Sequence, residues 1–428
     1  MNIYKLLLLP LLIMNSTAFA KCDSYQHLFL IHGIGSSPDT FGKMGETLER
    51  HFDCKKAHSY AYATEHPKLS IHDFSKGLND FINQQQISKN DTVGFIMHSQ
   101  GGLIGLDWLY QAFHKKNGYH NNRLSQFTHY ISASTPFWGS DFSSLGDNFF
   151  YSLDGIDQDM IPMGEVQLKD MKYGSQKSLD RLRFINGDDQ GFKNFLEEKI
   201  KVLNIKASLP RPSKELIDDI AAIFEGDLVV NVPSMEMNVN YFKEEAEEYN
   251  SDLVKIERNE TLNLKTAYVT GAHTSGTPVP AVVKVPWYCR WKSICSHEGY
   301  EAIYRFLSDG SVYQVGSIKN NIRSFEIHIR VKLPKGFEEN EDVELSILDE
   351  DNEEVVISYY RNDRSDYTPL RFNEDGEVAY FLVKGIVRDS SDPRVEFQIT
   401  HPQMKTRFYS APVSKGKVTQ LETYLMSK

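Results

Sequence analysis

Short apolar runs alternate with amphipathic stretches along most of this 428-residue chain. The apolar runs predict buried strands at residues 26–31, 57–64, 93–97, 127–133, 199–207 and 262–270. Between them, apolar side chains recur at helical spacing and predict helices at residues 40–52, 71–84, 103–110 and 301–307. Alternating strands and helices are typical of an α/β fold, in which helices cover a parallel sheet.

The pattern changes after Gly310. Apolar and polar side chains alternate strictly over residues 325–333, as in a half-buried strand. Further short apolar runs begin at Val343, Val355, Ala379, Val395 and Thr406, with turn-rich spacers between them. We therefore predict an all-β sandwich at residues 309–428, following an α/β domain at residues 21–308. It has no catalytic constellation, so its role stays open between stabilisation or assembly and the binding of lipid interfaces, glycans or a secretion partner.

The most informative stretch covers residues 91–105, DTVGFIMHSQGGLIG. A buried strand runs into His98, and a helix follows shortly afterwards. Ser99 would therefore lie at the apex of a sharp strand-to-helix turn, with its hydroxyl exposed to the amides at the start of the helix. Gly101 and Gly102 would let that helix pass close to the strand.

This His-Ser-Gln-Gly-Gly turn resembles the nucleophile elbow of the α/β-hydrolase family, in its lipase and thioesterase branch. The usual G-x-S-x-G motif has glycine where this chain has Met97, whose larger side chain would crowd the turn. The resemblance covers about residues 25–308. It implies a mostly parallel sheet with helices on both faces and a cap or lid insertion, which we expect at about residues 141–195.

Two further motifs resemble segments that have functional roles in the α/β-hydrolase family. The His-Gly turn after the first strand implies that the backbone amides of Ile34 and Gln100 form the oxyanion hole. The segment GDLVV, followed by V-P-S, resembles the D-G-V-V segment of bacterial lipases, which implies that Asp227 is the catalytic acid. Asp188 and Asp189 are alternatives, although they precede the strand at residues 199–207.

Two histidines follow the strand at residues 262–270. His273 lies at its very end, whereas His297 lies just ahead of the last helix. Because the family usually has its histidine immediately before that helix, we expect His297 to be the base and keep His273 as the alternative. The order Ser99, Asp227, His297 is the order expected for this fold. Such a triad would activate the serine hydroxyl for attack on an acyl group.

The first twenty residues have the features of a secretory signal peptide. Lys5 supplies the positive start, residues 6–14 form an apolar core too short to span a bilayer, and Ala18-Phe19-Ala20 is a typical cleavage site. Lys21 excludes a lipoprotein, because a small residue would be needed there. We therefore predict that residues 1–20 are removed and that the protein is secreted or periplasmic.

Four cysteines allow three disulfide pairings in an exported chain. We predict Cys22–Cys54 and Cys289–Cys295. The first two residues lie near the starts of strands that would be adjacent and parallel, and the second bridge would fix the loop that carries His297. A zinc site is the alternative, but the chain has no C-x-x-C pair.

A net charge of −11 without basic clusters argues against binding to nucleic acid or to anionic membranes, and no later run is long enough to span a membrane. The sequence therefore predicts an exported serine hydrolase that cleaves carboxylic esters of lipids without a cofactor. A structural calcium ion, found in some similar lipases, stays open. The alternatives are a phospholipase, a thioesterase or an acyltransferase on the same triad, and a non-catalytic binding protein, which Met97 favours.

Overall fold

The computed structural model describes most of the chain. The described residues are 22–140, 164–175, 177–178, 181, 185, 189–210, 225–227, 229–244, 253–274, 280–291, 297–334, 343–348, 355–360, 378–388 and 391–426. The predicted signal peptide and residues 141–163 of the predicted cap lie outside this set.

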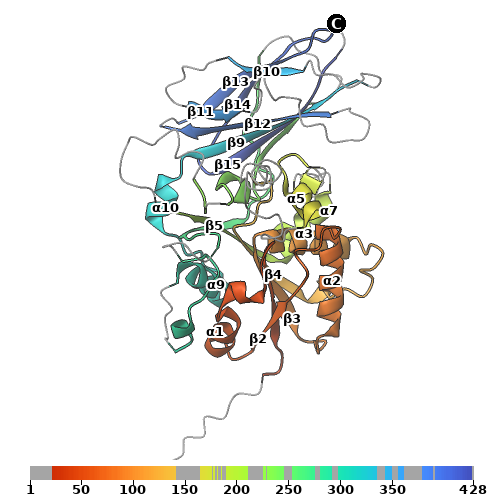
Figure 1. The fold of residues 1–428 in the computed structure, drawn as a ribbon, viewed down its shortest axis with the longest axis vertical. Helices are drawn as coiled ribbons and strands as arrows, with labels where there is room; N and C mark the ends of the chain where they lie inside the picture. The colour runs from red at the N-terminus through yellow and green to blue at the C-terminus, as the bar shows by residue number, and fades with distance from the viewer. Residues whose placement is uncertain are drawn as a thin grey trace, which may run out of the picture.

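Six parallel strands form the central sheet, in the order β2-β1-β3-β4-β5-β8. Its labelled strands β2, β3, β4 and β5 lie in the lower part of Figure 1, below the strands labelled β9 to β15. The bounds of the six central strands are β1 (Gln26–Ile31), β2 (Lys55–Tyr60), β3 (Thr92–His98), β4 (Phe127–Ala133), β5 (Lys201–Ser208) and β8 (Lys265–Thr270). Each of the six predicted runs forms one of these strands. The central strands are almost continuously apolar because both faces of the sheet are buried.

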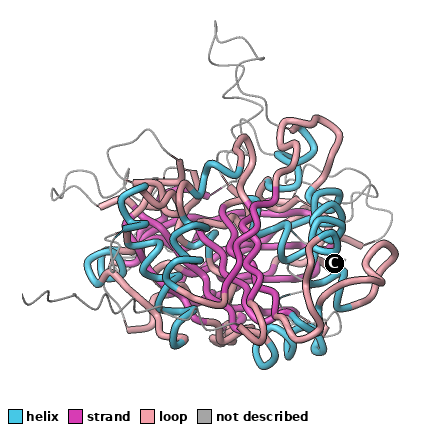
Figure 2. Tube along the Cα trace, turned by 90° about the horizontal axis from the view of Figure 1, so that it is seen from below, coloured by secondary structure: helices cyan, strands magenta, loops and turns pink. Residues whose placement is uncertain are grey.

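Helices cover the two faces of the sheet. On one face α2 (Ile71–Gln84) and α3 (Gln100–Phe113) share a core with Phe29 and Phe95. On the other face α1 (Met44–His51) and α9 (Glu298–Asp309) pack on Leu28, Leu30 and Ile96. Seen along the long axis of the molecule, strands run through the middle with helices to both sides (Figure 2).

The other helical elements whose bounds fall within the described residues are short. They are α5 (Glu165–Met171), α7 (Gln190–Asn194), α10 (Gly316–Asn321), a π-helical turn (Phe195–Lys199) and 3-10 turns at Pro38–Phe41, Leu124–Gln126, Pro233–Met235 and Trp287–Trp291. Among the described residues, no helix has the length and apolarity needed to span a membrane.

Two further sheets form the all-β part predicted for the C-terminal region, and we call them together the β domain. One sheet has the strand order β10-β13-β14-β7, and the other β11-β12-β9-β15-β6. The bounds are β6 (Asn240–Lys243), β7 (Val254–Lys255), β9 (Ser324–Lys332), β10 (Glu344–Ile347), β11 (Val355–Tyr360), β12 (Val378–Val387), β13 (Arg394–Thr400), β14 (Arg407–Pro412) and β15 (Lys417–Tyr424). Apolar side chains from both sheets form one core.

Strands β6 and β7 come from the middle of the chain. Strand β6 pairs with β15 and β7 pairs with β14, so both join sheets whose other strands follow residue 308. The chain then returns to the central sheet as β8. Sequence analysis placed this whole segment in the α/β domain, and it did not anticipate that two short strands would extend the β domain.

The polar side chains of β9 lie against the rest of the protein instead of solvent. Glu326, His328 and Arg330 are all buried, although they alternate with the apolar residues that face the core. Tyr173, which follows α5, donates a hydrogen bond to the Glu326 carboxylate at 3.0 Å. Lys384 lies 3.7 Å from the same carboxylate. The alternation in β9 therefore marks an interface between the two parts of the molecule.

Candidate active site

Ser99 lies in the sharp turn that the sequence predicts. It follows the last residue of β3 and precedes Gln100, the first residue of α3. Its backbone angles, φ 54° and ψ −128°, are unusual for a residue with a side chain and carry strain. A Cβ atom at Gly101 would collide with the carbonyl oxygen of Ile31, so the helix could not pass so close to β1 with a larger residue there.

Met97 is accommodated by a glycine on the following helix. Its side chain is fully buried and fills the space that Gly105 leaves open, where an added Cβ would collide with the sulfur atom. The departure from G-x-S-x-G is thus compensated within α3.

The side chains of Ser99, His273 and Asp227 form one hydrogen-bonded chain. His273 Nε2 lies 2.8 Å from Ser99 Oγ, and His273 Nδ1 lies 2.7 Å from Asp227 Oδ2. Since a carboxylate only accepts hydrogen bonds, the Nδ1–H donates to Asp227, which leaves Nε2 to accept the serine proton. The three residues are 4%, 6% and 0% exposed, so water screens this chain very little.

The backbone holds Asp227 and His273 together. The amide of His273 donates to the carbonyl oxygen of Asp227 at 2.9 Å. The second carboxylate oxygen of Asp227 accepts hydrogen bonds from the amides of Val229 and Val230 at 3.2 and 2.9 Å. The carboxylate is thereby fixed in one orientation.

The prediction that His297 stands beside Ser99 and Asp227 is wrong, because His297 caps a helix. Its Nδ1 accepts the amide proton of Tyr300 in the first turn of α9, and its Nε2–H donates to the carbonyl oxygen of Ala281 at 3.0 Å. Both ring nitrogens are therefore used, and burial lowers the pKa of this imidazole. The position before α9, which favoured His297 in the sequence, belongs to a capping residue.

The alternative acids lie elsewhere or outside the described residues. Asp189 caps α7 through the amide of Phe192 and pairs with His114 at 2.5 Å. Asp188 is not among the described residues.

The turn after β1 lies directly against the serine. A Cβ atom added to Gly33 would stand 2.7 Å from Ser99 Cβ and 3.1 Å from Ser99 Oγ, so only glycine fits there. Ile34 follows this close contact, and Gln100 begins α3 on the other side of Ser99. The positions agree with the backbone donors expected from sequence, whose role in an oxyanion hole stays a prediction.

Side chains behind the serine connect the elbow to α5. Tyr62 donates to the carbonyl oxygen of His32 at 2.6 Å and to the side chain of Gln100 at 3.3 Å. Gln100 in turn donates to Gln167 of α5 at 3.1 Å, and Gln167 donates to the carbonyl oxygen of His66 at 3.2 Å. The residue after the serine is therefore tied to the segment in which we expect the cap. The sequence gives no signal of these contacts.

A second histidine lies next to His273. The rings of His98 and His273 are 4.6 Å apart between centroids. Burial, together with the neighbouring imidazoles of His273 and His32, holds the pKa of His98 well below its ordinary value. His98 is therefore neutral near pH 7 and adds no positive charge beside His273.

One predicted disulfide is present in full. Cys22 and Cys54 are bonded, with their Cα atoms 5.7 Å apart, and they join the segments that lead into β1 and β2. Cys289 is also disulfide-bonded, while its expected partner Cys295 lies outside the described residues.

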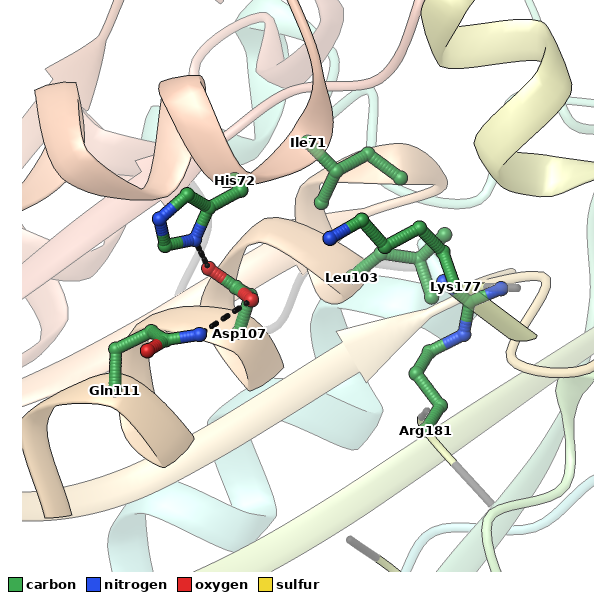
Figure 3. A pocket seen from close by; sticks show the side chains of 7 residues that line it. All are labelled: Ile71, His72, Leu103, Asp107, Gln111, Lys177 and Arg181. Atoms are coloured by element: carbon green, nitrogen blue, oxygen red, sulfur yellow. Dashed lines mark hydrogen bonds and ion pairs between the residues drawn. The ribbon is translucent and has the colours of Figure 1, made fainter. Parts of the chain in front are cut away.

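A small pocket of about 90 Å³ lies between α2 and α3 (Figure 3). His72 and Asp107 form an ion pair at its wall with 2.9 Å between Nδ1 and Oδ2, and the hydrogen bond raises the pKa of His72. Arg181 reaches the pocket but binds the carbonyl oxygen of Phe137 at 2.9 Å. None of the pocket residues belongs to the Ser99 chain. Among the described residues, no cluster of three or more His, Cys, Asp or Glu side chains could hold a metal ion.

Comparison with known proteins gives similarity only at the level of structure. No family model and no curated protein matches this chain. Phospholipase PlaB from Legionella pneumophila is 13% identical, with 94% of each chain covered and a TM-score of 0.62. A second PlaB structure, a complex with thio-NAD, covers the same shares at 13% identity with a TM-score of 0.61. The Bacillus licheniformis lipase BlEst2 is 16% identical and covers 49% of this chain and 78% of its own, but its TM-score of 0.34 carries no argument.

At 13% identity the similarity to PlaB is evidence of a common fold alone. It extends over nearly the whole chain and thus includes the β domain as well as the parallel sheet. With the elbow at Ser99 after a central parallel strand, this chain has the α/β-hydrolase fold, followed by an all-β domain.

Proposed function

We propose that this protein is a serine hydrolase that cleaves carboxylic esters of lipids through an acyl-enzyme on Ser99. The observation that carries the proposal is the hydrogen-bonded chain from Ser99 through His273 to Asp227, buried at a nucleophile elbow. A serine hydroxyl becomes a good nucleophile when a histidine takes its proton and a carboxylate stabilises the resulting imidazolium. The elbow supports this role because it directs the hydroxyl out of the sheet.

The proposed reaction has two halves. In the first, Ser99 Oγ attacks the ester carbonyl carbon while its proton passes to His273 Nε2. The amides of Ile34 and Gln100 stabilise the oxyanion, and the leaving alcohol then takes the proton from His273. In the second half, water attacks the acyl-serine with His273 as general base, which releases the carboxylic acid and restores Ser99.

A defined series of ester substrates would identify the substrate class. The fold is shared with a phospholipase over both parts of the chain, which makes phospholipids the first esters to test. Glycerides, simple carboxyl esters and acyl thioesters complete the series. A preference for thioesters, or acyl transfer to an alcohol in place of water, would point to the thioesterase or acyltransferase alternative.

The assignment of the base is tested with a matched pair of variants. His273→Ala should lower kcat by about 10⁴- to 10⁶-fold, because the proton acceptor of Ser99 is lost. His297→Asn should keep kcat within about twofold, since asparagine is itself a good helix cap. Circular dichroism would verify that both variants fold. Normal turnover in His273→Ala, or a complete loss in His297→Asn, would contradict the assignment.

We also propose that the protein is exported. The disulfide between Cys22 and Cys54 supports this, because such bonds persist in oxidising compartments. The intact mass of protein recovered from outside the cytoplasm should correspond to a chain that begins at Lys21. Recovery of the uncleaved chain from the cytoplasm with both cysteines reduced would contradict export.

A further inference from the structure

The segment between the proposed acid and base passes through the β domain. After Asp227 the chain runs to β6, which pairs with β15 through Asn240 and Thr419. It then forms β7 on β14 and returns as β8, whose last residue, Thr270, lies three positions before His273. The β domain therefore holds the middle of the connection between Asp227 and His273, at β6 and β7.

A buried carboxylate joins the loop of Asp227 to the first strand of the β domain. Glu225, two positions before Asp227, is buried. It accepts hydrogen bonds from the amide of Arg323 at 2.8 Å and from the amide of Ser324, the first residue of β9. Hydrogen bonds from backbone amides to an ionised carboxylate are about twice as strong as neutral ones. The Glu225 carbonyl also accepts the amide of Val232 at 3.0 Å, which closes the loop around Asp227.

Apolar contacts support the same loop. Val232, at the end of the loop, packs against Ile318 of α10 and Ile322, which lead into β9. These side chains are all buried. The loop therefore meets the C-terminal region through an ionic hydrogen bond on one side and a small apolar cluster on the other.

A buried lysine makes a second connection from the central sheet. Lys206 of β5 donates to the carbonyl oxygen of Gly416, in the turn before β15, at 2.7 Å. It also pairs with Glu236 at 2.5 Å, and both charges are buried. Glu236 lies just after the loop around Asp227 that runs from Glu225 to Val232, which we call the acid loop. The turn before β15, the central sheet and the end of the acid loop are therefore joined at one point.

We propose that the β domain positions the acid–base pair, and that Glu225 is a positioning residue that orients Asp227 toward His273. The expected effect on catalysis rests on the proposed function. The expected effect of Glu225 on the orientation of Asp227 does not depend on the substrate. A shift of about 1 Å in a group that must be aligned for reaction can cost about 100-fold in rate, so a loop held at two points from the β domain matters for activity.

The test is Glu225→Gln, which keeps the shape of the side chain but removes its charge and turns an NH₂ group toward a backbone amide. We expect kcat to fall about 10- to 100-fold with KM nearly unchanged. The acidic limb of the pH–rate profile should also move to lower pH. The physical reason is that a less well-oriented Asp227 stabilises the imidazolium of His273 less.

A matched control separates positioning from general loosening of the interface. Tyr173→Phe removes the hydrogen bond to Glu326, which joins the same two parts of the molecule away from the acid loop. The Tyr173→Phe variant should have a lower unfolding temperature than the wild-type protein and an unchanged pH–rate profile. Should Glu225→Gln not fold, Val232→Ala loosens the loop more gently and should shift the profile in the same direction.

Histidine NMR makes the test independent of turnover. The Nδ1 proton of His273, which faces Asp227 at 2.7 Å between the heavy atoms, is assigned by comparison with a His273→Gln variant. Its resonance should move upfield in Glu225→Gln relative to the wild-type protein, because the hydrogen bond to a displaced Asp227 is weaker. If Glu225→Gln shows this shift but the wild-type protein hydrolyses no ester, the positioning role would be supported and the proposed function refuted. An unchanged resonance and an unchanged rate in folded Glu225→Gln, or an equal shift of the resonance in Tyr173→Phe, would overturn the positioning role.

Discussion

At the scale of single residues, the protein shows how a departure from a motif is compensated nearby. Met97 stands where an elbow usually has glycine, and it packs where Gly105 has no side chain. All five residues from 101 to 105 are glycine, leucine or isoleucine, so nothing in the sequence identifies Gly105 as the partner of Met97. The pairing follows only from how closely α3 crosses β3.

This pairing predicts a reversal of an ordinary helix preference. Gly105→Ala would normally stabilise a helix by about 1 kcal/mol, but here the added methyl group collides with the Met97 sulfur. We expect the free energy of unfolding to fall by about 1–3 kcal/mol, the usual cost of overpacking. In a Met97→Ala background the same change should be neutral or stabilising. Urea unfolding of the four proteins measures this cycle, and equal effects of Gly105→Ala in both backgrounds would contradict the contact.

Residue type and position identified Ser99 and Asp227 as members of one site, and the geometry brings both together. They could be found because each belongs to a longer motif whose neighbours are fixed by a local turn. The choice between His273 and His297 could not be made in this way. Both histidines follow β8, one at the strand end and the other at the start of α9. A catalytic base and a helix cap can each occupy either kind of position, so the local sequence does not distinguish them.

At the scale of secondary-structure elements, the six strands of the central sheet could be predicted because each is a continuous apolar run buried on both faces. Strands β6, β7 and β15 were missed for a common reason. They are short or polar, with sequences such as NYFK and KVTQLETY, and each becomes a strand through partners distant in the sequence. Such pairing depends on tertiary context more than on the local pattern.

Several strand and loop histidines predict how stability depends on pH. Burial lowers the pKa of His129 on β4 to about 4, with further contributions from Lys201 and Lys55. Burial also lowers the pKa values of His32 and His98. In the unfolded chain these imidazoles bind protons below about pH 6.5, whereas in the folded protein they stay neutral to lower pH.

The contribution of these histidines should therefore be constant above about pH 6.5 and should fall as the pH is lowered from 6.5 toward 4. His72 acts in the opposite direction, because its hydrogen bond to Asp107 raises its pKa and its contribution is lost as the pH rises above 6.5. Each such histidine adds up to about 1.4 kcal/mol per pH unit to the slope. Unfolding by urea at several pH values measures the effect, and His129→Gln should make the slope shallower. A stability that rises as the pH falls through this range would contradict the burial of these groups as neutral imidazoles.

At the scale of the whole molecule, the two parts of the chain are joined through more than one connection. The polar face of β9, the strands β6 and β7, and the contacts of Glu225 and Lys206 all link the α/β part of the molecule to the β domain. The sequence shows a change of pattern near Gly310 and suggests two independent units. It cannot show that the polar positions of β9 face protein, because a buried polar face and a solvated one have the same period.

The central claim is that Ser99 is an activated nucleophile, and the most direct measurement is the intact mass of the protein after reaction with a fluorophosphonate. We predict one adduct per chain in the wild-type protein, no adduct in Ser99→Ala, and a labelling rate reduced by several orders of magnitude in His273→Ala. The probe requires no knowledge of the natural ester. A wild-type protein that stays unlabelled, with detergent present to expose the site, or a label retained in Ser99→Ala, would contradict the account.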